Sequence, residues 1–223
     1  STNVTYSYTY YDNGNIKSVS DGENTTSYVY DSANQLIREN NQAGNYTHTW
    51  TYDQAGNILN RKEYAYTTGT LGTPTDTVTY TYGDEQWGDL LTAYDGNTIT
   101  YDGVGNPLSD GEWTYTWEKG RQLASITNGS ATWTYTYNAD GMRISKTNGS
   151  ATYRYVYNGS QLSQMTVGNN TLTFTYDASG RPVAVTYNGT TYFYATNIQG
   201  DVLAIMDADE DTVEAWKNGV EPL

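Results

Sequence analysis

Few residues in this sequence have the types and spacing that chemistry requires. Cysteine is absent, which excludes a thiol nucleophile and a four-thiolate zinc or iron–sulfur centre. The single histidine, His48, stands in an alternating segment with Tyr46, Trp50 and Tyr52. A general base is one role for such a residue. The two-residue period of a strand instead predicts that its ring stacks in a row of aromatic side chains.

Carboxylates are the other candidates for chemistry. The segment Asp207-Ala208-Asp209-Glu210-Asp211 begins like a calcium-binding loop, but Thr212 and Asn218 stand where such a loop needs Gly and Glu. Paired carboxylates for glycoside hydrolysis would have to come from the 25 Asp and Glu residues, most of which occupy turns. The sequence therefore predicts no catalytic residue, no metal site and no cofactor.

Charge and hydropathy exclude further classes of protein. The net charge is -14, and only 11 Lys and Arg residues are present to neutralise phosphates, which argues against binding to nucleic acid. No apolar run is long enough to span a bilayer. The first residues, Ser1-Thr2-Asn3-Val4, do not resemble a signal peptide.

The elements that would position any site are indicated by aromatic residues at every second position. The chain has 24 Tyr and 6 Trp against 2 Phe, and these residues alternate with Thr and Ser. Trp133, Tyr135 and Tyr137 form one such trio, and Tyr153, Tyr155 and Tyr157 form another. Since neighbouring side chains of a strand point to opposite faces, each trio predicts a strand with one aromatic face and one hydroxyl-bearing face.

A turn motif follows these strands along the whole chain. An aromatic residue, usually Tyr, is followed by Asp or Asn, then by a short stretch with Gly or Asn, and then by an aliphatic residue. The acid or amide accepts a backbone hydrogen bond and starts the turn, and Gly supplies a positive φ. Many units close with an Asn-Gly pair such as Asn148-Gly149, a strong hairpin signal. The predicted structural turn residues are Tyr11, Asp12, Tyr30, Asp31, Tyr52, Asp53, Gly56, Asn57, Tyr101, Asp102, Gly105, Asn106, Tyr137, Gly141, Tyr176, Asp177 and Gly180.

The repeat predicts an all-β fold of tandem β-hairpins in one long antiparallel sheet. Each unit of roughly twenty residues supplies two strands and two turns, as expected of a repeat architecture. We expect a single repeat domain over residues 1–223. A longer loop is expected within about residues 64–87, which include Gly69, Gly72 and Pro74.

The registered Tyr-Asp turns resemble those of the Rhs/YD-repeat proteins, a group that includes bacterial polymorphic toxins, wall-associated proteins and teneurins. The stretch Asn197-Ile198-Gln199-Gly200-Asp201-Val202, within a C-terminal segment of about residues 192–216, is similar to the end of the Rhs core. The resemblance covers essentially the whole chain. It implies a sheet wound as a spiral into a shell. Family shells use many more repeats, so an open scroll or partial shell is expected here.

The resemblance also implies a function. The chain would be a non-catalytic structural segment of a secreted or cell-surface bacterial protein, whose β-shell encloses or displays a partner or a toxin domain. Its own partners would be further repeats of a longer parent chain, or other copies paired through sheet edges. No self-cleavage residues carry over from the toxin members. The alternative is a binding module whose exposed Tyr and Trp side chains hold a glycan or a partner protein.

Overall fold

The computed structural model describes residues 5–197 and 199–209, and this part of the chain is built from strands and turns without a helix. The strands of the first half are β1 (Ser7–Tyr10), β2 (Ile16–Ser20), β3 (Thr25–Tyr30), β4 (Leu36–Asn41), β5 (Tyr46–Tyr52), β6 (Ile58–Ala65), β7 (Asp76–Thr81), β8 (Ala93–Tyr94), β9 (Asn97–Thr98), β10 (Thr100–Tyr101) and β11 (Pro107–Ser109). Those of the second half are β12 (Thr114–Glu118), β13 (Gln122–Thr127), β14 (Thr132–Tyr137), β15 (Arg143–Thr147), β16 (Thr152–Asn158), β17 (Gln161–Val167), β18 (Asn170–Tyr176), β19 (Pro182–Tyr187), β20 (Thr190–Thr196) and β21 (Val202–Met206). A search of the same residues for a helix able to cross a membrane finds none.

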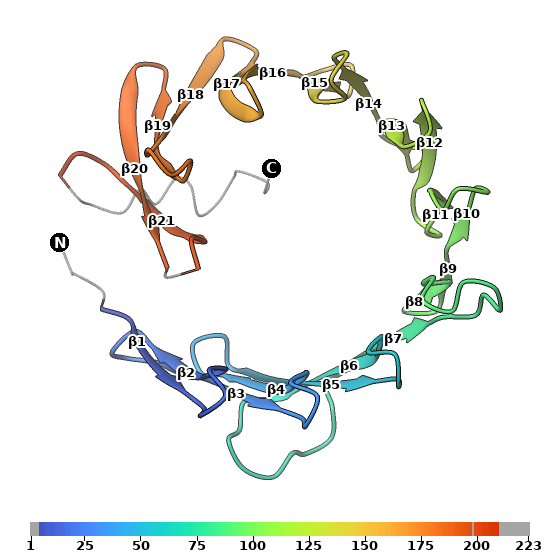
Figure 1. Ribbon diagram of the computed structural model, residues 1–223, viewed down its shortest axis with the longest axis vertical. Helices are drawn as coiled ribbons and strands as arrows, with labels where there is room; N and C mark the ends of the chain where they lie inside the picture. The colour runs from blue at the N-terminus through green and yellow to red at the C-terminus, as the bar shows by residue number, and fades with distance from the viewer. Residues whose placement is uncertain (1–4, 198, 210–223) are drawn as a thin grey trace. The chain divides into compact units, whose positions relative to one another are not determined.

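Hydrogen bonds join the strands into two antiparallel sheets. One contains nine strands in the order β1 to β9, and the other contains twelve in the order β10 to β21. Consecutive strands therefore lie side by side, as Figure 1 shows along the run from β1 to β7. The predicted all-β fold of tandem antiparallel hairpins is confirmed. The expected single sheet is interrupted between β9 and β10, where the strands shrink to two residues each.

The chain also divides into two compact units. The N-terminal unit comprises Thr2–Glu112 and the C-terminal unit comprises Trp113–Leu223, so the boundary falls between β11 and β12. Hairpins of the same kind build both units.

The alternation in sequence sets the two faces of each sheet. Tyr135 lies opposite Lys146, which in turn lies opposite Tyr153, so these three side chains share what we call the aromatic face. The residues between them form the hydroxyl face, where Thr136 and Ser145 join their hydroxyl groups at 2.7 Å. Thr9 and Ser18 make the same pair at 2.6 Å in the N-terminal unit. The two-residue period of the strands therefore places the aromatic rings on one face of the sheet and the hydroxyl groups on the other.

An irregularity in register recurs just before the motif aromatic residue. The pairing shifts between Thr51 and Tyr52, and Leu59 of the return strand is passed over, which is the signature of a β-bulge. The same shift occurs between Thr136 and Tyr137 and between Thr175 and Tyr176. The bulge is a constant feature of the hairpin, and it increases the local twist where the turn begins.

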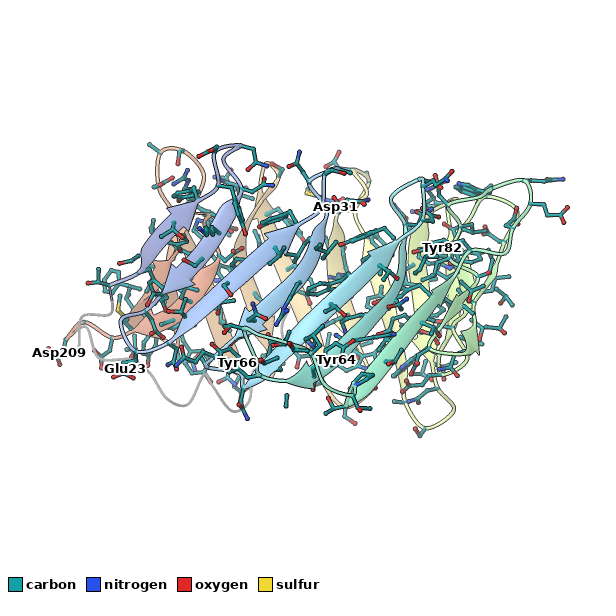
Figure 2. The ribbon with its side chains drawn as sticks, turned by 90° about the horizontal axis from the view of Figure 1, so that it is seen from below. Glu23, Asp31, Tyr64, Tyr66, Tyr82 and Asp209 are labelled. Atoms are coloured by element: carbon teal, nitrogen blue, oxygen red, sulfur yellow. The ribbon has the colours of Figure 1, made fainter. Side chains whose placement is uncertain are left out.

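The two kinds of turn lie at opposite ends of the strands. In the N-terminal unit, Figure 2 shows Asp31 and Tyr82 toward one end, and Glu23, Tyr64 and Tyr66 toward the other. The expected loop within residues 64–87 is more ordered than a single loop, because it contains strand β7. Two irregular segments remain there, residues 66–75 before β7 and residues 82–92 after it.

Buried side chains gather differently in the two units. In the C-terminal unit, Tyr155, Met165, Leu172 and Val185 form one apolar cluster across β16 to β19. Tyr155 lies opposite Met165, and Met165 lies opposite Leu172. In the N-terminal unit the buried residues are Tyr64, Val78, Asn40, Thr47 and Asn106. Polar groups thus take a larger share of the interior there.

Candidate functional site

The best-defined constellation in the molecule is the Tyr-Asp turn, and the turn at Asp53 shows its construction. Tyr52 ends β5. One carboxylate oxygen of Asp53, Oδ1, accepts hydrogen bonds from the backbone N–H groups of Ala55 at 2.8 Å and Asn57 at 2.9 Å. The backbone N–H of Asp53 donates to the carbonyl of Asn57, and that of Gly56 donates to the carbonyl of Asp53. A single acid therefore fixes the whole turn.

The same bonds recur in the other copies. The side chains of Asp31, Asp102, Asn138, Asp177 and Asn197 each accept from the backbone N–H groups two and four residues on. Gly56, Gly105, Gly141 and Gly180 have φ between 81° and 96°, and Asn34 takes the equivalent place at 64°. Tyr101 and Tyr176 end β10 and β18, as predicted, directly before Asp102 and Asp177.

The first copy of the turn differs from the sequence prediction by one residue. Strand β1 ends at Tyr10, and Tyr11 stands where the other copies have Asp. The backbone N–H of Tyr11 donates to the carbonyl of Asn15, and that of Gly14 donates to the carbonyl of Tyr11. Asp12 therefore lies one position further into the turn than predicted. The doubled tyrosine at positions 10 and 11 explains the displacement, because either residue fits the sequence pattern.

The motif tyrosine links its own repeat to the preceding one. The hydroxyl of Tyr52 donates to the carbonyl of Leu36 at 2.6 Å. The equivalent bonds run from Tyr101 to Leu91, from Tyr137 to Leu123, from Tyr157 to Arg143 and from Tyr176 to Leu162. The acceptor is the first or second residue of the return strand of the earlier hairpin, or lies just before that strand in the case of Leu91. We call this bond the hydroxyl latch. It explains why the motif uses Tyr, since Phe could not donate.

A second contact passes between repeats beside the latch. A side chain added at Gly56 would meet the amide of Gln35 at 3.1 Å, and one at Gly180 would meet the amide of Gln161 at 3.0 Å. Gly141 has Gln122 as its neighbour at 3.5 Å. In each case the glutamine precedes a latch acceptor. At Gly105 the neighbour is instead the ring of Trp87, at 2.7 Å.

The surroundings shift the pKa values of three latch tyrosines and of two turn acids. Burial raises the pKa values of Tyr52, Tyr101 and Tyr176. The side-chain hydrogen bond from Asn57 is the largest cause that lowers the pKa of Asp53, and a backbone hydrogen bond from Asn106 does the same for Asp102. A carboxylate already occupied by several N–H donors is a poor general base. The constellation is therefore suited to holding backbone in place.

His48 lies within the row of rings, as the strand period predicts. Its ring centroid is 4.3 Å from that of Tyr46 and 5.7 Å from that of Trp50. Its Nε2 lies 3.0 Å from a carboxylate oxygen of Glu63. Glu39 faces it from β4 and accepts a hydrogen bond from the Tyr46 hydroxyl at 3.1 Å. Burial, followed by the nearby charge of Glu39, raises the pKa of Tyr46.

Sequence reasoning missed a polar network on the opposite face of the same strands. The hydroxyl of Thr47, which is 0% exposed, donates to the carbonyl of Thr67 at 3.0 Å and accepts from the backbone N–H of Thr67 at 3.0 Å. Arg38 donates to the carbonyls of Thr67 and Gly69 and to the side chain of Asn40. The segment 66–75 is thereby tied over the hydroxyl face. The length of the loop expected within residues 64–87 is the only sequence signal that points to this network.

The tryptophans of the aromatic rows are half-buried. Trp113, Trp117 and Trp133 all have intermediate exposure. Lys146 lies over the rings of Trp133 and Tyr153, at 5.4 and 4.6 Å from their centroids. A flat, open stacking platform of the kind that a glycan would need is therefore not formed by Trp133. By contrast, Trp87 lies outside the rows and is 49% exposed.

The remaining sequence candidates lie near the C-terminus. The backbone N–H of Asp209 donates to the side chain of Asp207, but the rest of the acidic stretch lies outside the described residues. Of the segment 192–216, residues 198 and 210–216 also lie outside them, and the described part holds β20, the Asn197 turn and β21. Within the described part of the chain, no cluster of His, Asp and Glu could hold a metal ion.

Comparisons with known proteins show that the chain shares its fold with parts of solved structures. No family model matches the sequence, and no curated protein does. A chain in the structure of the Tc holotoxin pore of Photorhabdus luminescens superposes with a TM-score of 0.67 at 16% identity, over 93% of this chain and 13% of that one. The crystal structure of TcdB2–TccC3–TEV gives 0.55 at 16% identity over 93% and 13%. That of TcdB2–TccC3–Cdc42 gives 0.54 at 15% identity over 93% and 14%. The chain thus has the fold of a small part of these toxin-complex chains.

Proposed function

We propose that this chain is a non-catalytic wall segment of a secreted or cell-surface bacterial protein of the Rhs/YD-repeat kind. In that protein, a shell of tandem hairpins encloses or displays a partner or toxin domain. The observation that carries the proposal is the superposition on Tc toxin chains over 93% of this chain but only 13% of theirs. A fold that covers only a small part of a much longer chain of similar structure supports the interpretation of this chain as a segment.

The hydroxyl latch supports this proposal because it can be extended without limit. In five hairpins the motif tyrosine bonds to a carbonyl of the preceding hairpin, so each of these hairpins is tied to its predecessor. Among the described residues, β1 is one outer strand of the nine-stranded sheet and β21 is one outer strand of the twelve-stranded sheet. An outer strand presents unpaired N–H and C=O groups, which invite pairing with another strand. Further repeats of a longer parent, or another copy of the chain, would satisfy them.

Exposed aliphatic side chains give a second line of support. At five of the bulges the residues passed over are Leu59, Leu108, Ile144, Val183 and Leu203, and each is 38–45% exposed. Other bulges pass over Lys17 and Ser163, so exposed apolar groups recur at this position in several hairpins but not in all. Such exposed apolar surface marks a site of interaction with other protein surface. In the proposed wall, an enclosed or neighbouring chain would cover it.

The edge is tested by measuring the mass of the isolated chain across a concentration series by analytical ultracentrifugation. We expect the wild-type chain to self-associate, and the double variant Ser7→Lys with Thr9→Lys to remain monomeric, because charged side chains blunt an edge strand. Thr134→Lys is the matched control, since it adds Lys to the hydroxyl face of a strand with neighbours on both sides. A wild-type chain that stays monomeric throughout would refute the edge-pairing proposal.

The absence of catalysis is tested at the one histidine. The variants His48→Gln and Glu63→Gln should change stability without abolishing any turnover of glycan or peptide substrates. Gln at position 48 keeps a hydrogen-bonding side chain beside Glu63 and removes the imidazole. Turnover by the wild-type chain that either substitution abolishes would contradict the non-enzymatic proposal. The glycan-binding alternative has lost support from Trp133, whose ring is covered by Lys146.

A further inference from the structure

The N-terminal unit contains a cavity beside the Tyr-Asp turn at Asp102. It has a volume of about 670 Å³ and lies between the irregular segment 82–92 and the turn at Asp102. Its wall includes Asp84, Trp87, Leu90, Ile99, Tyr101 and Asp102. A ring that is 49% exposed therefore shares a concave site with two carboxylate side chains.

The cavity arises from a departure from the repeat. In the turns at Gly56, Gly141 and Gly180, a glutamine of the preceding hairpin lies against the glycine. At Gly105 the glutamine is replaced by Trp87, which comes from a longer connection than the tight Tyr-Asp turn. The connection is ordered by its own bonds. Oδ1 of Asp84 accepts from the backbone N–H groups of Gln86 at 2.9 Å and Trp87 at 2.7 Å.

Neighbouring bonds hold the connection in place over the sheet. Asn57 donates to the side chain of Asp89 at 3.1 Å, and the backbone N–H of Leu90 donates to the carbonyl of Trp87 at 2.9 Å. The hydroxyl latch of Tyr101 reaches Leu91 at 2.6 Å. Trp87 is thus presented by an ordered segment, which reduces the entropy lost when a ligand binds.

The charge of the site is negative. The residues that line the cavity include Asp84 and Asp102 and no Lys, Arg or His. Both carboxylates have Oδ1 engaged by backbone donors, which fixes the position of each side chain. The hydrogen bond from the Asn106 backbone is the largest cause that holds the pKa of Asp102 below its usual value, so this acid is ionised at neutral pH. An anionic ligand is therefore disfavoured.

We propose that this cavity is a binding site for a compact organic cation, an ammonium or guanidinium group held against the Trp87 ring beside Asp84 and Asp102. Trp is the best aromatic partner for a cation, and the attraction is greatest where the cation loses water. Leu90 and Ile99 offer apolar surface to the carbon atoms that surround such a charge. A neutral sugar would use the ring and could donate hydroxyl hydrogen bonds to a carboxylate, but only a cation gains the Coulombic attraction of two fixed negative charges. The inference is independent of the proposed wall function.

Binding can be measured on the whole chain by calorimetry or ligand-observed NMR with three probes. Choline represents a free ammonium compound, and N-acetylarginine amide represents the side chain of a partner protein. Dimethylbutanol, the uncharged carbon isostere of choline, is the matched control. We expect millimolar binding of at least one cation, weakened by added salt, and binding of the isostere to be several times weaker. Whichever cation binds more tightly identifies the source of the natural ligand.

Two variants and one control test whether the cation binds at Asp84 and Trp87. Asp84→Asn keeps an oxygen that can accept from Gln86 and Trp87 but removes the charge, and Trp87→Leu removes the ring. Each should weaken cation binding by roughly two- to fivefold or more, the range of an exposed cation–π contact. Asp177→Asn makes the same charge change at an equivalent turn in the C-terminal unit and should leave binding unchanged. Circular dichroism would verify that each variant folds.

Three outcomes would overturn the proposal. One is equal binding of choline and its isostere, which would show that charge plays no part. Another is binding of a neutral sugar such as N-acetylglucosamine in preference to both cations. The third is the absence of binding by any probe while Trp87 remains in a folded chain. In that last case the tryptophan acts only as packing against Gly105.

Discussion

The two units of the molecule share one hairpin and fill their interiors differently. The C-terminal unit buries an apolar cluster of Tyr155, Met165, Leu172 and Val185. The N-terminal unit places Asn40 and the hydroxyl of Thr47 beneath the segment 66–75, on the face that also holds Tyr64, while the buried Val78 lies on the opposite face. The repeat therefore specifies the turns, the register and the latch, and leaves the covering of each face to local sequence.

The two interiors should also respond differently to substitutions. An apolar cluster is non-directional, and it loses stability in proportion to the surface that is exposed again. A buried polar network depends on every partner, because a donor or acceptor left without one retains its full desolvation cost. The stability of the N-terminal unit should therefore depend on the loss of single hydrogen-bonding atoms. The stability of the C-terminal unit should depend on the volume of the apolar side chains that are removed.

The largest effect is expected at high pH, where both units should unfold. Burial raises the pKa values of Tyr28 in the N-terminal unit and Tyr155 in the C-terminal unit, and it raises the pKa of Tyr194 to about 12. A folded pKa above the unfolded value of about 10 means that the stabilising contribution is complete below pH ~10 and is lost as the pH rises through the folded values. Circular dichroism and tyrosinate absorbance should change together between about pH 10 and 12. Tyrosine ionisation that is complete near pH 10 in a folded chain would contradict this.

Next in size is the loss of a ring from the apolar cluster. Tyr155→Ala should destabilise the C-terminal unit by about 3–5 kcal/mol, because the large side chain leaves a cavity against Met165. Hydrogen exchange read by mass spectrometry should show loss of protection in β16 to β18, with the N-terminal unit unchanged. Tyr135→Ala removes a half-buried ring nearby and should cost less. Equal costs at the two positions would show that burial does not set the effect.

The polar network should respond to the change of one atom. Thr47→Val keeps the shape of the side chain but removes the hydroxyl, leaving the N–H and C=O of Thr67 without this partner. The free energy of unfolding should fall by about 1–3 kcal/mol. Faster hydrogen exchange in residues 66–75 would locate the change. Thr49→Val on the same face of β5 is the control, and a similar loss there would show that the network has no special role.

The smallest effect is expected at the latch, and it should be equal in the two units. Tyr52→Phe and Tyr176→Phe each remove one hydroxyl-to-carbonyl bond and should cost about 0.5–1.5 kcal/mol by denaturant unfolding. Tyr153→Phe provides a comparison on the same aromatic face. A clear difference between positions 52 and 176 would mean that the latch also depends on the unit around it.

The sequence predicts the repeat well because its signals are local. Period-two aromatic residues fix the faces, and an acid followed by a glycine fixes the turn, so Asp53, Asp102 and Asp177 lie where they are expected. The first turn was displaced because Tyr10 and Tyr11 fit the pattern equally well. The histidine was placed in the row of rings for the same local reason.

The rest depends on contacts between distant segments. Thr47 reads like any other outward-facing threonine, and its burial follows from a loop that returns twenty residues later. The sequence does not predict the acceptors of the hydroxyl latch either. Every residue has a backbone carbonyl, so residue type does not show which carbonyl accepts the bond. The sequence predicts Trp87 only as part of a loop, and its contact with Gly105 arises when the connection folds over the sheet.

The hydroxyl latch has a consequence for how the chain folds during synthesis. The five latches reach backward, from a tyrosine to a carbonyl made 10–16 residues earlier, whereas Tyr11 of the first turn donates forward to the carbonyl of Tyr28. A hairpin that carries a latch therefore finds its acceptor already made when it leaves the ribosome. Assembly can proceed one hairpin at a time from the N-terminus, with only the newest edge exposed. Pausing translation should thus leave a shorter, ordered sheet rather than a collapsed chain awaiting its other half.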